Sequence, residues 1–176
     1  MRTLTLILSL LLIFSCKSRN EAQNTASAEE QKPEKDTVVV MVEKPTSPDD
    51  TLVIAFEKTP CFGRCPVYKV KVYESGFATY EGLNFTEKMG LYAYRFSEPE
   101  IESIYNRAVE IGYFELKSEY DDKLITDLPS TISEINYKDK SHRVKARINA
   151  PEKLINFHKN LAVTLQEKDW ETYSER

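Results

Sequence analysis

The sequence predicts an α+β domain in which an antiparallel sheet of five or six strands packs against two helices, in the order β-β-β-β-α-β-β-α. Three observations predict this class. Several short segments alternate between apolar and polar residues, as half-buried strands do. These segments follow one another through hairpin turns rather than helical crossovers, which favours antiparallel pairing. Two longer segments carry apolar residues at helical spacing behind a start signal.

Four strands are expected in the first half of the domain. The clearest of them alternates, with Tyr68, Val70 and Val72 on one face and lysines on the other. A turn around Gly76 joins this strand to a returning arm, which indicates a hairpin. The four expected strands cover residues 52–56, 67–73, 77–81 and 91–96.

A helix should follow these strands, beginning after Ser97. Ser97 can cap the free backbone N–H groups, Glu100 can reach back to the cap, and Pro99 suits the first turn. Gly112 can end the helix because it adopts the left-handed conformation without steric cost. The apolar face of this helix consists of Ile101, Ile104, Tyr105 and Ala108.

The second half of the domain repeats the theme of strands followed by a helix. Residues 131–137 and 142–148 have the pattern of a hairpin, and a second helix is expected to start at Pro151. We therefore expect a single domain over residues 51–166 and a C-terminal tail over residues 167–176. The apolar face of the second helix consists of Leu154, Phe157, Leu161 and Leu165.

The N-terminus has the pattern of a bacterial lipoprotein signal. Arg2 provides a positive start, and the apolar run over residues 4–14 is too short to cross a bilayer. The run ends in Leu-Ile-Phe-Ser-Cys, which resembles a lipobox, although Phe14 is bulkier than the usual residue there. We expect residues 1–15 to be a cleaved signal peptide and Cys16 to carry the lipid. An ordinary cleaved signal with an incidental cysteine is the alternative.

Lipid on Cys16 would anchor the protein stably to a membrane. Two or three acyl chains give stable membrane binding, whereas a single chain binds only marginally. The residues after the anchor, Lys17 and Ser18, lack the aspartate that marks inner-membrane retention in some bacteria. The expected location is therefore the cell envelope, on the outer membrane and facing the periplasm. The expected partners are the membrane, through the lipid, and another envelope protein or an envelope polymer.

Residues 16–50 are expected to form a flexible linker, because they are polar, rich in charge and proline, and free of aromatic residues. Residues 37–42 break this pattern with a compact β-prone run, Thr-Val-Val-Val-Met-Val. This run is either a further strand of the domain or an apolar piece of linker, and the sequence favours neither.

The charge balance argues against a nucleic-acid partner. The formal net charge is -4, and the sequence contains no dense block of lysine and arginine. General nucleic-acid binding depends on clustered bases that neutralise phosphates.

Cys61 and Cys65 are expected to form a disulfide, because an exported chain enters an oxidising compartment. Gly63 between them permits the tight bend that the short loop requires. A thiol redox role for this pair stays open as an alternative. Two thiols offer too few ligands for a zinc or iron–sulfur site, so we expect no metal and no cofactor.

The string Cys-Phe-Gly-Arg-Cys-Pro-Val-Tyr over residues 61–68 carries a family resemblance. Together with other elements, it is similar to a family of small bacterial lipoproteins that share a domain of unknown function. The resemblance spans roughly residues 51–165 and implies an exported, usually lipidated domain without an assigned activity. The other elements are Gly76, residues 80–82, Tyr120 and residues 126–129.

The candidate partner contacts are Arg64, Tyr120 and Asp127. Arg64 at the tip of the cysteine loop has the chemistry to grip an anion or a carboxylate, although a solvated loop charge is the simpler interpretation. The carboxylates around Asp121 and Asp127 suggest either a calcium site or the acid–base pair of a small hydrolase, but they lack calcium-loop spacing.

The remaining polar residues have simple structural interpretations. His142 and His158 lack ligand spacing and are expected to be partly buried structural residues. The basic stripe of Arg143, Lys145 and Arg147 is either a solvated strand face or a contact for an acidic partner. The sequence contains no nucleophile, metal-protease or phosphate-loop motif. It therefore favours a non-enzymatic binding or structural domain over an enzyme.

Overall fold

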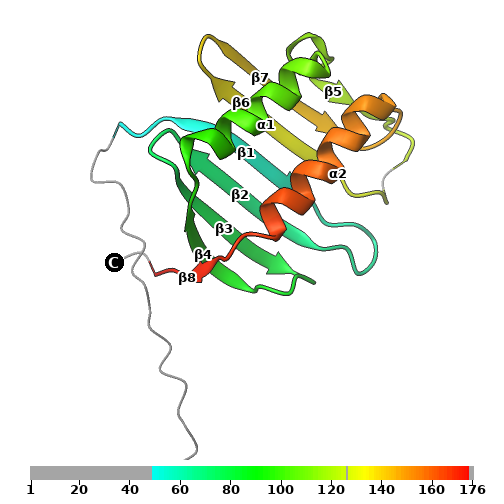
Figure 1. Cartoon of the computed structure of the whole chain (residues 1–176). Helices are drawn as coiled ribbons and strands as arrows, with labels where there is room; N and C mark the ends of the chain where they lie inside the picture. The colour runs from blue at the N-terminus through cyan, green and yellow to red at the C-terminus, as the bar shows by residue number, and fades with distance from the viewer. Residues whose placement is uncertain (1–48, 126, 175–176) are drawn as a thin grey trace, which may run out of the picture. The chain divides into compact units, whose positions relative to one another are not determined.

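The computed structural model describes residues 49–125 and 127–174, and these form one mixed α+β domain. The described residues build a single eight-stranded sheet with the strand order β5-β7-β6-β1-β2-β3-β4-β8 (Figure 1). The strands are β1 (Leu52–Lys58), β2 (Val67–Tyr73), β3 (Phe77–Asn84), β4 (Gly90–Arg95), β5 (Glu119–Tyr120), β6 (Thr131–Tyr137), β7 (Lys140–Ala146) and β8 (Glu171–Thr172).

Strand β1 lies inside the sheet, because the two halves of the domain meet on it. Strands β1 to β4 form an antiparallel meander on one side, and the β6–β7 hairpin pairs with the other edge of β1. The short β5 runs parallel to β7, and β8 pairs with β4. The expected hairpins and antiparallel class are therefore present.

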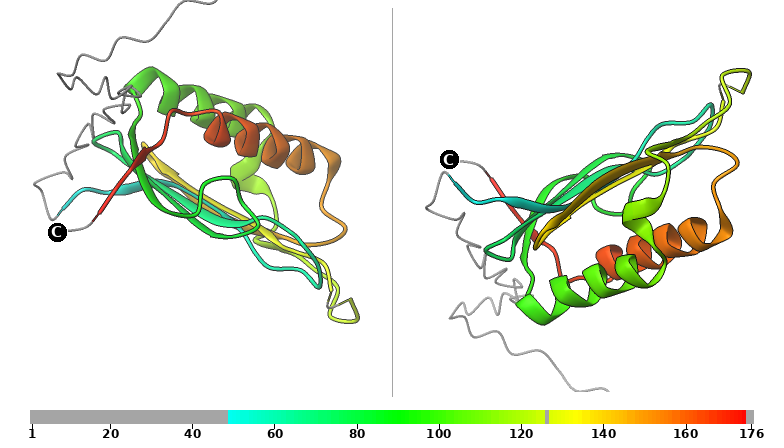
Figure 2. Two further views of the ribbon diagram at one scale, coloured as in Figure 1. Left: turned by 90° about the horizontal axis from the view of Figure 1, so that it is seen from below. Right: turned by 90° about the horizontal axis from the view of Figure 1, so that it is seen from above.

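Two helices cover one face of the sheet, α1 (Glu98–Glu110) and α2 (Glu152–Gln166), as Figure 2 shows from two sides. Helix α1 begins at the expected capping box, where the Ser97 backbone N–H and hydroxyl both donate to Glu100. Lys168 also donates to Glu100 at 2.5 Å. Burial alone would raise the pKa of Glu100, but the hydrogen bonds from Lys168 and Ser97 bring it down to about 2.

The strand count and order differ in detail from the expectation. The two additional strands, β5 and β8, have two residues each and lie at opposite edges of the sheet. A 3-10 helix, η1 (Tyr113–Glu115), follows α1. Residues 167–174, expected to be a tail, contain β8 and the buried side chain of Trp170. Two-residue strands have no periodicity of their own, so the pattern that predicts longer strands could not find them.

Several expectations concern residues outside the described part of the chain. These are the signal peptide over residues 1–15, the lipid site at Cys16, most of the linker and the β-prone run at residues 37–42.

The core lies between the sheet and the helices. Tyr68, Val70 and Val72 of β2 point into it, as their alternation predicts, and Phe56 of β1 lies 6.1 Å from the Tyr68 ring. The expected apolar faces of both helices are buried against this layer. Because strand side chains alternate, β1 to β3 and β6 to β7 present their other residues on the opposite face.

That opposite face carries charges of alternating sign. Glu57 of β1 pairs with Lys69 of β2, and Lys69 pairs with Glu81 of β3 on its other side. Glu134 of β6 lies opposite Arg143 of β7 in the same way. Opposite charges on neighbouring strands attract each other, so this face is a compensated polar surface.

Gly82 of β3 is required by a close approach of backbone. A Cβ at this position would overlap the carbonyl oxygen of Lys88 and lie 2.8 Å from the Thr86 hydroxyl. We expect Gly82→Ala to lower the free energy of unfolding by roughly 1–3 kcal/mol, as overpacking does. Gly63→Ala is the control, because its Cβ would meet only the Cys61 sulfur at 3.8 Å. Urea unfolding measures both, and equal stability of the two variants would contradict the expectation.

Candidate functional site

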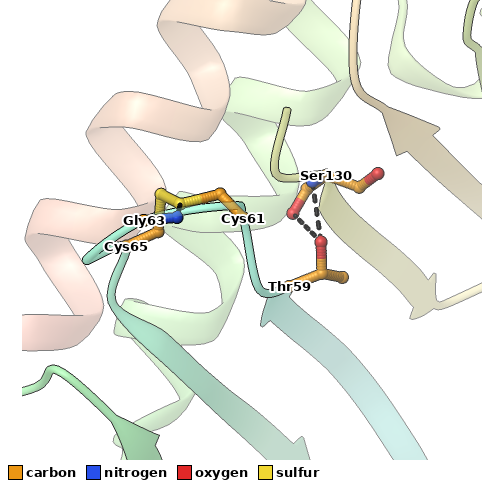
Figure 3. The surroundings of a disulfide bond; sticks show 5 residues. All are labelled: Thr59, Cys61, Gly63, Cys65 and Ser130. Carbon is orange, nitrogen blue, oxygen red and sulfur yellow. Dashed lines mark hydrogen bonds between the residues drawn. A yellow bond between two sulfur atoms is a disulfide. The ribbon is translucent and has the colours of Figure 1, made fainter. Parts of the chain in front are cut away.

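Three loops meet at one end of the sheet, and we call this region the loop end. It consists of residues 59–66 between β1 and β2, the end of β3 from residue 83 with the β3–β4 loop up to the first residue of β4 at position 90, and the described residues of 121–130 before β6. Backbone and side-chain hydrogen bonds join Thr59 to Ser130 (Figure 3). The loop end therefore combines segments that lie far apart in the sequence.

A disulfide between Cys61 and Cys65 closes the first of these loops, with the two Cα atoms 5.8 Å apart (Figure 3). The backbone N–H of Gly63 points back to the Cys61 sulfur at 3.2 Å. The backbone N–H of Phe62 donates to the carbonyl oxygen of Asp127 at 3.4 Å, which ties this loop to the loop before β6. These links restrict the conformations of the loop.

Large apolar side chains gather at the loop end. Phe62 is 91% exposed and Leu124 is 92% exposed. Of the nine large hydrophobic side chains that the described residues expose, six lie here: Phe62, Leu83, Phe85, Met89, Leu124 and Leu128. Because contiguous apolar patches mark interaction surfaces, this concentration of exposed apolar side chains makes the loop end the candidate surface.

The candidate contacts from the sequence separate into two places. Arg64 lies at the loop end, with its guanidinium 5.5 Å from the centre of the Phe85 ring, and Asp127 lies there too. Tyr120 instead lies on β5 and is half-buried, and its hydroxyl accepts a hydrogen bond from the backbone of Lys117 at 3.2 Å. The structure therefore places Arg64 and Asp127 on loops at the same end of the sheet and leaves Tyr120 at the sheet edge.

A cleft of about 230 Å³ adjoins the loop end, between the start of β2, the β3–β4 loop and the end of α2. Residues of the family resemblance build two of its sides, namely Pro66 and Tyr80. Gly82 allows the β3–β4 loop to fold closely over β3 beside it. The cleft is also lined by Phe85, Thr86, Glu87, Lys88, Gln166 and Trp170.

Asp121, one of the two acidic residues that suggested a hydrolase, forms an ion pair with Arg147. Arg147 donates to Asp121 at 2.5 Å, and this hydrogen bond holds the pKa of Asp121 below its usual range. A general acid needs the opposite shift. Asp122 accepts from the backbone N–H of Leu124 at 3.0 Å and so shapes its own loop. These contacts give no support to an acid–base pair.

A serine and a histidine form a hydrogen bond inside the core. Ser133 Oγ lies 2.8 Å from His158 Nε2 and 2.7 Å from the hydroxyl of Tyr113. All three side chains are at most 4% exposed, so no substrate can reach the hydroxyl. Burial, with a smaller effect of the Lys58 charge, lowers the pKa of His158 to about 4. The three residues therefore form a buried structural network. They lie on different elements, so the sequence alone could not predict that they interact.

The basic stripe on β7 is compensated. Arg143 lies 3.9 Å from Glu134, and Lys145 lies 3.1 Å from Glu119. Arg147 pairs with Asp121. Each base of the stripe therefore has an acidic neighbour, which favours the interpretation as a polar strand surface.

Three further observations concern metal groups, membrane spans and a second groove in the described residues. Residues 49–125 and 127–174 contain no group of three acidic, histidine or cysteine side chains placed to hold a metal ion. None of the helices described is long and apolar enough to cross a membrane. A groove of about 390 Å³ runs between α1 and α2, but none of the residues that carry the family resemblance line it. The exposed apolar side chains and the adjoining cleft make the loop end the candidate site.

Burial of His158 predicts a pH-dependent stability. Because the pKa of His158 falls from 6.5 to about 4 on folding, the unfolded chain binds more protons between these values. Stability should thus be complete above pH 6.5 and fall by on the order of 3 kcal/mol as the pH drops to about 4. His158→Gln should flatten this slope in urea titrations, whereas His142→Gln should keep it. An unchanged slope in His158→Gln would contradict the expectation.

Comparison with known proteins gives a family for the chain. A model described as a domain of unknown function (DUF6438) matches residues 52–164, from the start of β1 to the last turns of α2. No curated protein matches the chain. The match covers more than half of the sequence and includes the disulfide loop, the β3–β4 loop and the buried network. The chain therefore belongs to the DUF6438 family, a domain of unknown function.

Proposed function

We propose that this protein is a lipid-anchored, non-enzymatic binding domain of the bacterial cell envelope, and that it binds another envelope protein through the loop end. The N-terminal sequence supports the location. A short apolar leader that ends at Cys16 has the pattern of a lipoprotein signal, and the polar residues that follow suit a linker. On this reading the lipid holds the domain at the outer membrane, facing the periplasm.

The observation that carries the binding role is the exposure of Phe62 on a closed loop. Phe62 is 91% exposed between two bonded cysteines, so a partner can bury its ring with little loss of loop entropy. Aromatic side chains and arginine are enriched in the core of protein interfaces, and Arg64 follows two residues later. Leu124 on the neighbouring loop extends the apolar surface.

The polar surroundings of Phe62 favour a protein partner. Asp127 and Arg64 place charges of both signs at the loop end, so the rim is neither basic nor acidic as a whole. A lipid surface or a polyanion would favour a clear excess of positive charge. A mixed polar rim around exposed apolar side chains is typical of protein–protein contacts.

The anchor makes a direct prediction. Mass spectrometry of the protein purified from membranes should find the mature chain beginning at Cys16, with a diacylglycerol on its sulfur. Cys16→Ala should remove the lipid and release the folded domain from the membrane fraction. An unmodified Cys16, or a leader that remains in the native product, would refute the envelope location.

Phe62 makes the second prediction. Phe62→Ala should weaken capture of the partner from native membranes by roughly 30-fold, as loss of an interface hot spot does. Its free energy of unfolding should be unchanged, because the ring makes few contacts within the domain. The matched control is Val163→Ala on α2, where an apolar side chain is 51% exposed away from the loop end. Equal capture by both variants, after quantification of the captured protein, would overturn the loop-end interface.

A further inference from the structure

We propose that residues 37–42 dock as an extended segment in the groove between α1 and α2 of the same chain. These residues lie outside the described part of the chain, and their sequence, Thr-Val-Val-Val-Met-Val, is apolar and β-prone. The contact goes beyond the proposed binding role and involves neither the loop end nor a partner protein. Four features support it: the polar wall of the groove, its length, the entry of the chain into the domain, and charge.

The groove has apolar residues at its bottom and polar residues around them. Its volume of about 390 Å³ lies within the range of roughly 300–1,000 Å³ found for ligand pockets, so it can hold several side chains. The buried lining residues are Ile104, Phe157 and Leu161, and Ile111 beside them is half-buried. Since the first three are packed in the core, the apolar surface that remains is a narrow strip, which suits a single extended segment.

Polar side chains line the α2 wall of the groove at a constant spacing. Asn156, Asn160 and Thr164 follow one another at intervals of four residues, so they repeat about every 6 Å along the helix. Backbone groups on one side of an extended chain repeat every two residues, or about every 6.6 Å. No hydrogen bond within residues 49–125 and 127–174 uses the side-chain amides of Asn156 and Asn160. These amides are therefore free to donate to and accept from the backbone of an extended segment.

The length of the apolar segment matches the length of this wall. Lys153 and Thr164 are the first and last lining residues on α2, and they lie about 16–17 Å apart along the helix axis. An extended chain covers about the same distance, roughly 16–17 Å, from residue 37 to residue 42. Val38, Val40 and Val42 share one face of such a segment and can point to the bottom of the groove.

The chain enters the domain close to one end of the groove. Asp50 accepts hydrogen bonds from the backbone N–H and the hydroxyl of Ser75, and Ser75 shares a small cavity with Glu98 at the start of α1. The lining of the groove begins at Ile104, about 9 Å further along this helix. The extended chain between Val42 and Asp50 can span up to about 26 Å, so the connection is long enough.

The entry also sets the direction of the segment. Helices α1 and α2 are antiparallel neighbours (Figure 1), because Lys168 after the end of α2 donates to Glu100 in the first turn of α1. At the other end of the groove, a Cβ on Gly112 would lie 3.5 Å from Lys153 Nζ. The segment enters at the Glu100 end with its C-terminal residue, so its N-terminal residue reaches Lys153.

The charges agree with this direction. The lining contains two bases, Arg107 and Lys153, and one acid, Glu110. Within the described residues, neither base forms an ion pair. Asp36 directly precedes the apolar segment, so its carboxylate meets the ammonium group of Lys153 when the segment docks. An exposed pair of this kind adds little affinity, but it favours one orientation over the reverse.

Hydrogen exchange, measured by mass spectrometry on the full mature chain purified from membranes in detergent, tests the docking. The amides of residues 38–42 should exchange at least about tenfold more slowly than in a synthetic peptide of residues 34–45, because the docked backbone is hydrogen-bonded to α2. The protection should be independent of protein concentration, since the segment and the groove belong to one chain. Phe62→Ala should leave it unchanged, because the loop end takes no part.

Variants locate the contact. Asn156→Ala together with Asn160→Ala should abolish the protection, and the domain should stay folded because both side chains are exposed and alanine favours a helix. The matched control is Asn106→Ala on α1, an exposed asparagine outside the groove, which should keep the protection. Lys153→Glu should lower the protection several-fold, and Asp36→Lys in the same chain should restore it.

Three results would overturn the proposal. The first is exchange of residues 38–42 at the rate of the synthetic peptide. The second is protection that survives in the Asn156 and Asn160 double variant, as it would if the segment were an edge strand of the sheet. The third is protection that grows with protein concentration, which would mean that the groove holds the segment of a second copy. None of these results affects the loop-end interface, which is measured by partner capture with Phe62→Ala.

Discussion

The structure depends on the burial of one face of the sheet beneath two helices. Strand residues alternate in direction, so the same strands that pack Phe56 and Tyr68 against α2 must present Glu57 and Lys69 to the other side. Packing of the apolar face against the helices removes a large hydrocarbon surface from water. The opposite face stays in contact with solvent, and its charges pair across neighbouring strands. The positions of the loops follow from this arrangement, because they connect strands whose register the core has fixed.

The loop end is where that register has consequences for function. Strand β1 pairs with β2 on one side and with β6 on the other, so the disulfide loop and the loop before β6 leave the sheet side by side. The bonds between Thr59 and Ser130 and the disulfide then fix their shapes. The exposed apolar residues on these loops support the proposed binding role, whereas the core beneath them stabilises the fold.

The buried network shows why a hydrogen bond between a serine and a histidine is weak evidence for catalysis. Ser133 and His158 have the contact that activates a nucleophile, but their burial lowers the pKa of the histidine and excludes substrate. Tyr113 binds both the hydroxyl and the backbone oxygen of Ser133, which completes the hydrogen bonding of this group. Such a fully buried network makes the helix–sheet interface specific.

The sequence by itself determined the α+β class, the antiparallel hairpins, the capping box at Ser97 and the helical apolar faces, because each has a local period or a local signal. It also singled out Arg64 and Asp127, but not Phe62, although a phenylalanine between two cysteines was a signal that could have been used. Only the tertiary structure decided the two-residue strands β5 and β8, the burial of Trp170, the separation of Tyr120 from the loop end, and the cleft. These features arise from contacts between segments that are distant in the sequence. A local sequence pattern does not specify which loops lie side by side once the sheet has formed and packed against the helices.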